Sequence, residues 1–349
     1  MKLYNAHYSR LMILPILLFI AFLAVILVYP GISLGLDFTG GTRILVKSNT
    51  LNAQEVESFL NEQFNLTELK VASISSPLGE NSVRIEFTED KTLVNARAQL
   101  NIALENASKN PSVASSAATN VLNALNIPVP ENTPAQELVD LAQTSLSQAA
   151  ASFSSKIQDA LVQHFNLGSA VEITREDISS SFGQNFWTQA LAVAVSSIVL
   201  LTLVIFVFFR EVIPSLAVIE AAAFDLLAAM AAMAVFNIPL SLSSIAALLA
   251  LIGYSVDTDI LLTTRLLKRK DKTLYERADE ALGTGLTMTF TAMAAVLVLM
   301  VISYYTQILV VFEIGFVMFF GMLGDLIATW FLNAPVLLMY IERKQGVNA

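Results

Sequence analysis

Long, almost uninterrupted hydrophobic runs alternate with short polar joints along most of this 349-residue chain. A hydrocarbon core of about 30 Å is crossed by roughly 20 apolar residues in a helix. Six stretches meet or approach that length, at residues 11–30, 186–209, 212–236, 242–265, 283–303 and 308–340. The pattern therefore predicts six transmembrane helices. The first follows Lys2 and Arg10 and lacks a small-x-small cleavage site after it, so we interpret it as a retained anchor.

One long segment departs from this pattern and is typical of a soluble domain. Overall 55% of the residues are hydrophobic and only 14% are charged, which is too little charge for the surface of a soluble protein of this length. This segment interrupts the hydrophobic sequence once, at residues 32–184. The predicted organisation is a first transmembrane helix at 1–31, a head domain at 32–184, a five-helix bundle at 185–341 and a tail at 342–349.

The positions of lysine and arginine predict the orientation, because positive residues in short loops stay cytoplasmic. A basic segment between the fourth and fifth stretches runs from Arg265 to Arg277, and further basic residues fall on the same side: Lys2, Arg10, Arg210, Arg343 and Lys344. We therefore expect a multi-pass protein of the cytoplasmic membrane with both termini in the cytoplasm. The head is then extracytoplasmic.

Within the head, residues 42–47 and 82–87 alternate apolar and polar positions, as strands with one buried face do. Residues 52–64 have helical spacing, and 69–74 and 170–174 are further strand candidates. This order predicts a ferredoxin-like β-α-β-β-α-β fold. Its second helical slot is oversized: residues 91–167 are rich in Ala, Ser, Asn and Leu and are broken by prolines, which indicates an inserted helical subdomain or, alternatively, low-complexity disorder.

Composition also excludes several kinds of chemistry. The chain has no cysteine, so disulfides, thiolate metal sites and cysteine nucleophiles play no part. A net charge of −9 and the lack of an aromatic-basic stripe argue against a nucleic-acid partner. The sequence contains no Gly-x-x-x-x-Gly-Lys loop for ATP and suggests neither a cofactor nor a bound metal.

Four aspartates lie deep inside the predicted spans, where an acid costs about 2.5–3.5 kcal/mol on insertion scales. They are Asp225, Asp257, Asp259 and Asp325. Such residues either serve only to hold helices together or respond to an ion gradient. Asp257 and Asp259 point about 200° apart on a helix, so at most one of them faces a given pathway, and position alone does not choose between them. Glu220 and Glu313 lie nearer the membrane edges, where long side chains reach solvent.

Small and hydroxylated residues indicate close helix packing in the last two spans. The fifth span carries Thr287 and Thr291 within a small, hydroxylated stretch formed by Gly283, Gly285, Thr287, Thr289 and Thr291. In the sixth, Gly321 and Gly324 precede Asp325, and Asn333 and Pro335 follow, which predicts a packed and bent face.

Two motifs resemble the SecF branch of the SecD/SecF protein-export family, which belongs to the RND superfamily, and the likeness in topology covers essentially the whole chain. After the first span stands Gly35-Leu36-Asp37-Phe38-Thr39-Gly40-Gly41, which is similar to the family's G-x-D-F-T/S-G-G element. In the fourth span, Gly253-Tyr254-Ser255-Val256 matches the family letter for letter.

Other positions depart from the bacterial pattern. Phe224 stands before Asp225 where the family carries histidine, and Asp257-Thr258-Asp259 replaces Asn-Asp-Thr. Thr258 thus occupies the position of the family's proton-linked aspartate, whereas Asp257 matches the sister SecD motif. Asp325 and the large helical insertion are similar to the archaeal branch.

The resemblance implies an accessory subunit of the Sec translocase, not an enzyme, that works with a SecD-like protein, the SecY translocon and the translocating polypeptide. It implies that the ion or proton gradient drives the protein, with Asp257, Asp225, Asp325 and Asp259 as coupling candidates. Two alternatives remain at this point. An RND-type half-transporter would move a lipid or small molecule, and an intramembrane aspartyl protease would use Asp225 and Asp325, although Met322 interrupts its second motif.

Overall fold

A computed structural model describes residues 3–4, 8–28, 31–48, 50–64, 66, 69–74, 81–88, 91–130, 133–168, 171–178, 180–268, 272–306 and 308–346. The chain forms two units. One combines Met1–Leu34 with Gln189–Ala349, and the other is Gly35–Thr188. The hydrophobic pattern predicts the corresponding boundaries of the head at residues 32 and 184.

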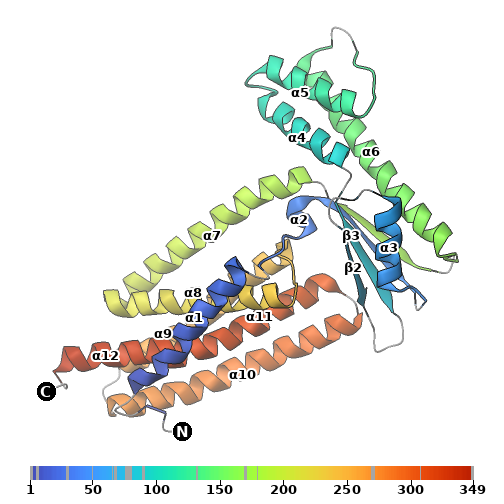
Figure 1. The fold of residues 1–349 in the computed structure, drawn as a ribbon. Helices are drawn as coiled ribbons and strands as arrows, with labels where there is room; N and C mark the ends of the chain where they lie inside the picture. Colours follow the sequence, from blue (N-terminus) through green and yellow to red (C-terminus); the bar gives the residue numbers. More distant parts are fainter. Residues whose placement is uncertain are drawn as a thin grey trace. The chain divides into compact units, whose positions relative to one another are not determined.

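The first unit is a bundle of long apolar helices (Figure 1). It contains a short 3-10 helix η1 (Tyr8–Met12), α1 (Ile13–Leu27), α7 (Ser180–Phe209, from Gln189 on), α8 (Val212–Val235), α9 (Leu242–Lys268), α10 (Leu274–Thr306), α11 (Leu309–Ile327) and α12 (Ala334–Gln345). Within the described residues, six helical segments are long and apolar enough to cross a membrane. The predicted class, a six-span α-helical membrane protein, is confirmed.

The fifth membrane helix, α10, starts nine residues before the predicted span, at Leu274. Its first turns carry charged residues, which end the hydropathy signal but do not break the helix. Arg277 is buried there and donates from Nη1 to the carbonyl of Leu266, 2.7 Å away. Arg265 likewise donates to the carbonyl of Glu280 at 2.9 Å, so the basic side chains fasten the turn between α9 and α10.

The sixth membrane helix is interrupted by a π-helical turn, η2 (Ala328–Asn333), between α11 and α12. Pro335 stands in the first turn of α12, where it has no N–H to donate. Ala334 donates to the carbonyl of Thr329, five residues back, and this is the π-helical register. The bend indicated by Asn333 and Pro335 is therefore a π-turn.

At the centre of the bundle α8, α9 and α11 pack against one another, while α10 packs on α9 and α11. In the first membrane helix and in α7, only 6% of the most hydrophobic 18-residue stretch is buried inside the protein. Phe22 of α1 packs edge-on against Phe224 of α8 at 5.5 Å between ring centroids. Ile205 and Phe209 attach the end of α7 to α8 and α9. Any functional site inside the bundle thus involves chiefly α8, α9 and α11.

The second unit contains the predicted ferredoxin-like sheet. Its strands are β1 (Gly41–Lys47), β2 (Leu69–Ile74), β3 (Ser82–Phe87) and β4 (Ile173–Ile178), in the order β2-β3-β1-β4 with every neighbouring pair antiparallel. One face is covered by α3 (Ala53–Gln63) and the end of α6 (Ala135–His164). The core between them includes Ile44, Ile85 and Leu60, all fully buried.

The fourth strand lies three residues later than predicted. β4 begins at Ile173 and runs to Ile178, whereas residues 170–174 had been expected, and Ala170 lies outside the described residues. The strand reads Ile-Thr-Arg-Glu-Asp-Ile, and its four central residues are exposed, so it carries little hydrophobic alternation. Polar contacts with β1 help to hold it: Arg43 pairs with Glu176 at 3.0 Å, and Thr42 donates to Asp177 at 2.8 Å.

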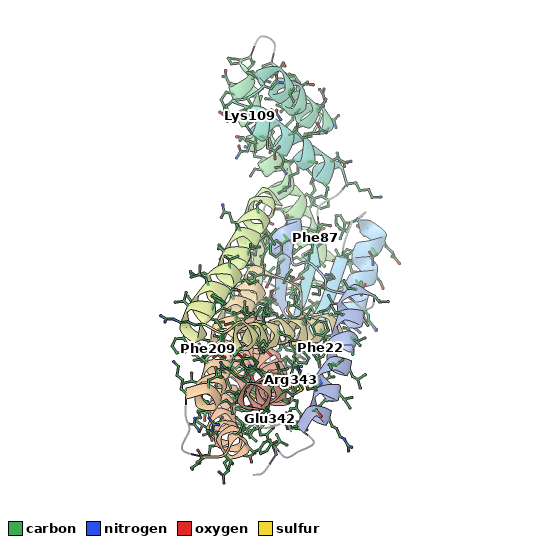
Figure 2. All side chains as sticks on the ribbon, turned by 90° about the vertical axis from the view of Figure 1, so that its left-hand side faces the viewer. Phe22, Phe87, Lys109, Phe209, Glu342 and Arg343 are labelled. Carbon is green, nitrogen blue, oxygen red and sulfur yellow. The ribbon has the colours of Figure 1, made fainter. Side chains whose placement is uncertain are left out.

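The oversized helical slot is a subdomain, and the alternative of disorder does not hold. Helices α4 (Lys91–Asn106) and α5 (Pro111–Ala124) pack against the first half of α6 around a separate apolar core. Figure 2 labels Phe87 in the sheet and Lys109 in the turn between α4 and α5, in different parts of this unit. The second half of α6 serves as the second helix of the ferredoxin-like fold, so one long helix joins the two cores.

Candidate functional site: a buried carboxyl cluster

Three of the four intramembrane aspartates lie in the interior of the bundle. Asp225 of α8, Asp259 of α9 and Asp325 of α11 are 1%, 0% and 0% exposed. Close helix approach makes this possible. A Cβ on Gly324 would lie only 2.6 Å from the Cβ of Ala228 and 3.6 Å from Oδ1 of Asp225. Glycine at this position lets α11 lie directly against α8, and Asp325 is the next residue.

Hydroxyl and amide groups donate to the carboxyl groups, and we refer to the three aspartates with Ser255, Thr329 and Asn333 as the carboxyl cluster. The hydroxyl of Thr329 is 3.0 Å from Oδ1 of Asp259 and 3.0 Å from Oδ1 of Asp325. Asn333 donates to Asp259 at 2.7 Å, and Ser255 donates to Asp225. Thr329 and Asn333 stand in the π-turn, so this turn presents the donors to Asp259.

Within the described residues, the cluster has fewer donors than its carboxyl oxygens can accept. Oδ1 of Asp225, Oδ2 of Asp259 and Oδ2 of Asp325 are buried without a hydrogen-bond partner. The single proton of Thr329 can be donated to Asp259 or to Asp325, but not to both. For the second interaction, the hydroxyl oxygen must accept a hydrogen bond from a protonated carboxyl group. The arrangement therefore suits groups that exchange protons with one another.

The fourth aspartate has a different environment. Asp257 and Gly253 lie on the outer side of α9, both exposed, and a Cβ on Gly253 would meet no atom within 4 Å. The fourth-span motif is thus divided between surroundings: Ser255 enters the cluster, Tyr254 is half-buried and Gly253 faces outward. The geometry assigns Asp259 to the interior and Asp257 to the surface, a choice that position along the sequence had left open.

The glycine motif after the first span forms a tight turn into the sheet. Leu36, Asp37, Phe38 and Thr39 make the short helix α2 (Leu36–Thr39), and Gly40 and Gly41 follow with φ angles of +74° and +140°. A Cβ on Gly41 would lie 2.4 Å from the carbonyl oxygen of Phe87 in β3. Both glycines have positive φ, which favours glycine, and at Gly41 there is also no room for a Cβ atom. Gly35 caps α2, Asp37 and Phe38 are half-buried, and the side chain of Thr39 lies outside the described part.

Two parts of the chain match models of known protein families. Residues 157–343 match the family model for the C-terminal part of the protein export membrane proteins SecD and SecF. The chain belongs to the SecD/SecF family. Residues 25–50 match the SecD/SecF GG motif, which includes the glycine turn described above. The predicted membership is confirmed.

Two relatives named protein-export membrane protein SecF come from archaea, in agreement with the archaeal-like branch. The protein of Methanothermobacter thermautotrophicus is 43% identical over 164 residues, which cover 46% of this chain and 55% of the relative. That of Pyrococcus furiosus is 43% identical over 169 residues, covering 48% of this chain and 56% of the relative. The match thus spans about half the length of these relatives.

A solved structure of the SecDF membrane protein shares the fold. The crystal structure of this translocon-associated protein from Thermus thermophilus superposes with a TM-score of 0.62 at 15% identity. The superposition covers 96% of this chain and 38% of the SecDF chain. It confirms the fold class of six membrane helices with an α+β head.

The assignment of Thr287 and Thr291 to helix packing is wrong within this chain. Both side chains are exposed and donate to their own helix, to the carbonyls of Gly283 and Thr287. The inward residues of α10 are instead Gly285 and Thr289, which are buried. A Cβ on Gly285 would collide with the ring of Trp330 at 2.2 Å. Alternating residues in a helix point to nearly opposite sides, so only part of the glycine and threonine run can face the bundle.

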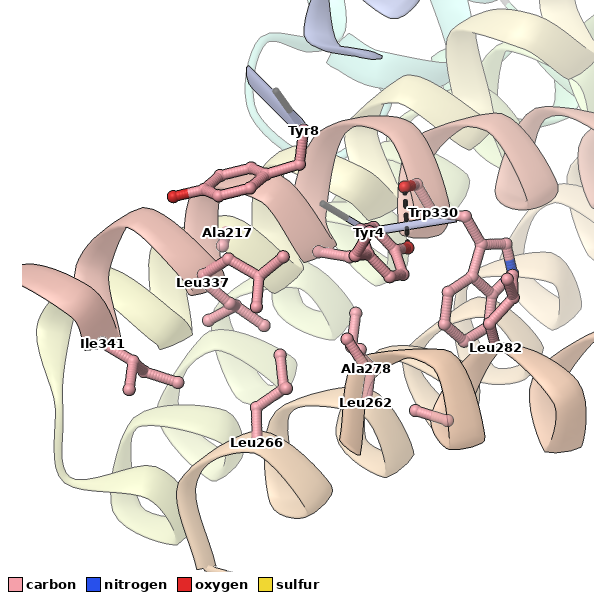
Figure 3. Close-up of a cluster of buried hydrophobic side chains, with 13 residues drawn as sticks. Tyr4, Tyr8, Ala217, Leu262, Leu266, Ala278, Leu282, Trp330, Leu337 and Ile341 are labelled. Carbon is pink, nitrogen blue, oxygen red and sulfur yellow. Dashed lines mark hydrogen bonds between the residues drawn. The ribbon is translucent and has the colours of Figure 1, made fainter. Parts of the chain in front are cut away.

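Sequence reasoning missed one contact that supports the π-turn. The π-helical register leaves the carbonyl of Trp330 opposite Pro335, which cannot donate. The hydroxyl of Tyr4 donates to this carbonyl at 2.9 Å (Figure 3). The backbone N–H groups of Leu3 and Tyr4 donate in turn to Asp279 at 2.9 and 3.4 Å. Burial, together with the charge of Asp279, raises the pKa of Tyr4, so its phenol stays protonated and can donate.

We expect Tyr4→Phe to destabilise the bundle by about 1–3 kcal/mol, because a buried carbonyl would lose its donor while the ring packing remains. Thermal or denaturant unfolding of the purified protein in detergent measures the effect. Tyr304→Phe is the matched control, since this side chain is 42% exposed and its change should be nearly neutral. Equal stability of the two variants would contradict the role assigned to Tyr4.

Proposed function

We propose that this protein is an accessory subunit of the Sec translocase that acts with a SecD-like partner to promote export of polypeptides across the cytoplasmic membrane. Family membership and the names of the relatives support an export role. The same observations favour export over the aspartyl-protease and small-molecule alternatives. The family is one of protein export and is not an enzyme family.

The carboxyl cluster supports an ion-driven mechanism, with protons as the favoured ion. Its aspartates lie on α8, α9 and α11, so a proton gained or lost changes which groups attract one another between three helices. Removing a proton leaves a buried charge whose donors are few. The helices then rearrange, or water enters, to solvate it. This is the single observation that carries the mechanistic part of the proposal.

The outer face of α9 supports a second membrane protein as partner. Ala246, Ala250, Gly253 and Asp257 succeed one another on this face, and all four are exposed. The exposed residues of α7 are instead mostly large and apolar, such as Leu200 and Leu203. A small-residue surface suits close helix contact. A carboxyl group facing lipid costs about 2.5–3.5 kcal/mol, which a polar or cationic group of a SecD-like partner would offset.

We also propose a topology with both termini in the cytoplasm and the second unit on the opposite side. Arg265 and Lys268 end α9, and Arg343 and Lys344 end α12. Lys344 pairs with Glu211 of the α7–α8 turn at 2.5 Å, and this hydrogen bond lowers the pKa of Glu211. The α7–α8 turn and the end of α12 therefore belong to one basic end of the bundle, which suits the cytoplasmic side. On the other side, the second unit contacts the translocating polypeptide and the SecY translocon.

Export should decrease when the gene is deleted, and affinity purification from native membranes in mild detergent should recover a SecD-like protein and SecY. Secretion of a reporter is measured by pulse-chase labelling, with re-expression of the wild-type chain as the control. Unchanged secretion under every ion gradient tested, together with no copurified Sec component, would contradict the proposal.

Gly253→Leu should reduce the amount of copurified SecD-like partner severalfold, because a bulky side chain on the small-residue face of α9 keeps a neighbouring helix at a distance. Ala192→Leu on α7 makes a comparable enlargement at another exposed position and should leave copurification unchanged. Partner yield is measured relative to the tagged chain. If Ala192→Leu reduced the yield as much as Gly253→Leu, the partner face would not be the outer face of α9.

A further inference from the structure

A second carboxyl group is buried on α11, well away from the carboxyl cluster to which Asp325 belongs. Glu313 is 2% exposed, whereas Glu220, the other glutamate placed near a membrane edge, is exposed as expected. Glu313, Val317, Gly321 and Asp325 follow one another at intervals of four residues, so they lie along one ridge of the helix. At 1.5 Å per residue, Glu313 and Asp325 are about 18 Å apart along the axis.

The partners of Glu313 form the start of α9. The hydroxyl of Ser241 donates to Oε2 of Glu313 at 2.6 Å, and the hydroxyl of Ser243 donates to the same oxygen. Ser241 and Ser244 also cap the helix: the N–H of Ser241 donates to Oγ of Ser244 at 2.7 Å, and the N–H of Ser244 donates to Oγ of Ser241 at 3.2 Å. The partial positive charge of a helix N-terminus favours a carboxylate at this place.

Leu240, the residue before this cap, pairs with the segment through which the chain leaves the first unit. The N–H of Leu240 donates to the carbonyl of Ser33 at 2.8 Å, and Leu34 forms a parallel β-bridge with Leu240. Leu34 is the last residue of the first unit before the glycine motif starts at Gly35. A continuous set of contacts therefore runs from Glu313 through Ser241 and Leu240 to Ser33 and Leu34.

We propose that Glu313 is a positioning residue that fastens α11 to the segment Ser33–Leu34, so that α11 transmits changes at Asp325 to the point where the chain leaves the bundle. The transmission step rests on the proposed function, whereas the fastening step stands on the contacts alone. A helix moves nearly as a rigid rod over three turns. A shift or rotation of α11 at Asp325 therefore reaches Glu313, and the hydrogen bonds of Glu313 carry it to the cap of α9 and to the bridge.

The chain has no cysteine, so no native cysteine has to be removed before two are introduced. Cysteines at positions 34 and 240 would form a disulfide only when the β-bridge between Leu34 and Leu240 is closed. Residues on paired strands are about 4.8 Å apart, which lies within the Cα separation of a disulfide. The rate of disulfide formation on addition of oxidant is followed in native membranes by cleavage between the two positions and gel mobility. This readout is independent of export.

We expect Glu313→Leu to slow formation of this disulfide severalfold, because the two serine hydroxyls lose their acceptor. Glu313→Gln keeps a carbonyl acceptor and should restore most of the rate, and Glu220→Gln should have no effect. If Glu313→Leu does not accumulate in membranes, the pair Ser241→Ala and Ser243→Ala removes the same hydrogen bonds from the other side. Unchanged rates in these variants would overturn the fastening role.

Transmission has its own test. Asp325→Asn should change the rate of disulfide formation at least twofold in the background with Glu313, and this response should vanish with Glu313→Leu. A merely structural contact would not produce this dependence. If Asp325→Asn left the rate unchanged, the transmission step would be overturned even where export and partner binding behave as proposed.

Discussion

Asp325→Asn should abolish stimulation of export by an ion gradient while leaving the protein folded. Thr329 lies between Asp259 and Asp325 and can donate its proton to either of them. Asparagine at position 325 cannot exchange a proton with Asp259, because its amide does not release a proton at physiological pH. Loss of a proton-transferring group typically lowers a rate by at least about a hundredfold, so gradient-dependent export should fall to background. Stability should be unchanged or slightly higher, since a buried ionisable group is removed.

The measurement combines two readouts on the same variant. Export of a reporter is followed in vesicles with and without an imposed proton gradient, and unfolding in detergent gives the stability. Glu220→Gln is the matched control, because it makes the same chemical change at an exposed carboxyl group of α8. Full gradient response in Asp325→Asn would remove the carboxyl cluster from the mechanism. An equal loss in Glu220→Gln would mean that the assay reports overall charge.

The features that could be predicted from sequence are those set by local patterns. Hydrophobic length gave six spans, because the bilayer thickness fixes how many apolar residues a helix needs. Alternation gave β1 and β3, whose alternate apolar side chains, among them Ile44 and Ile85, lie in the core of the second unit. It failed for β4, an edge strand that polar contacts with β1 help to hold. Its boundary could not be read from hydrophobic pattern at all.

Individual positions at the site depended on three-dimensional neighbours. Sequence identified the aspartates but could not decide between Asp257 and Asp259, because that choice depends on which side of α9 meets α8 and α11. Glu313 has its partners on another helix some 70 positions away in sequence. The spacing of four residues from Glu313 to Asp325 was available as a signal. The spacing relates the two carboxyl groups only because this ridge of α11 faces the interior of the bundle, which the sequence does not show.

The carboxyl cluster exists because α8, α9 and α11 lie in close contact. Gly321 and Gly324 precede Asp325 on α11, and a Cβ on either would collide, with Leu251 of α9 at 2.2 Å or with Ala228 of α8 at 2.6 Å. Small residues let backbones approach in lipid, where no hydrophobic effect drives helices together. The same approach brings the carboxyl groups of three helices into one buried volume. Packing and proton exchange therefore depend on the same glycines.

Gly324→Val should consequently destabilise the bundle by about 3 kcal/mol, at the upper end for overpacking, because its Cβ would lie 2.6 Å from the Cβ of Ala228. A Cβ atom is fixed to the backbone and cannot rotate away as the end of a flexible side chain could. Separation of α8 from α11 should also disturb the carboxyl cluster, so gradient-stimulated export should fall in the folded fraction as well. Thermal unfolding in detergent and reporter export in vesicles measure the two effects.

Gly253→Val is the matched control, since it makes the same change on the outer face of α9, where a Cβ would meet nothing. The isolated chain carrying Gly253→Val should unfold at the wild-type midpoint, whereas the partner face it occupies should bind less SecD-like protein. The two glycine variants thus separate packing inside the chain from packing between chains. Equal unfolding midpoints for Gly324→Val and Gly253→Val would contradict the close contact of α8 with α11 on which the carboxyl cluster depends.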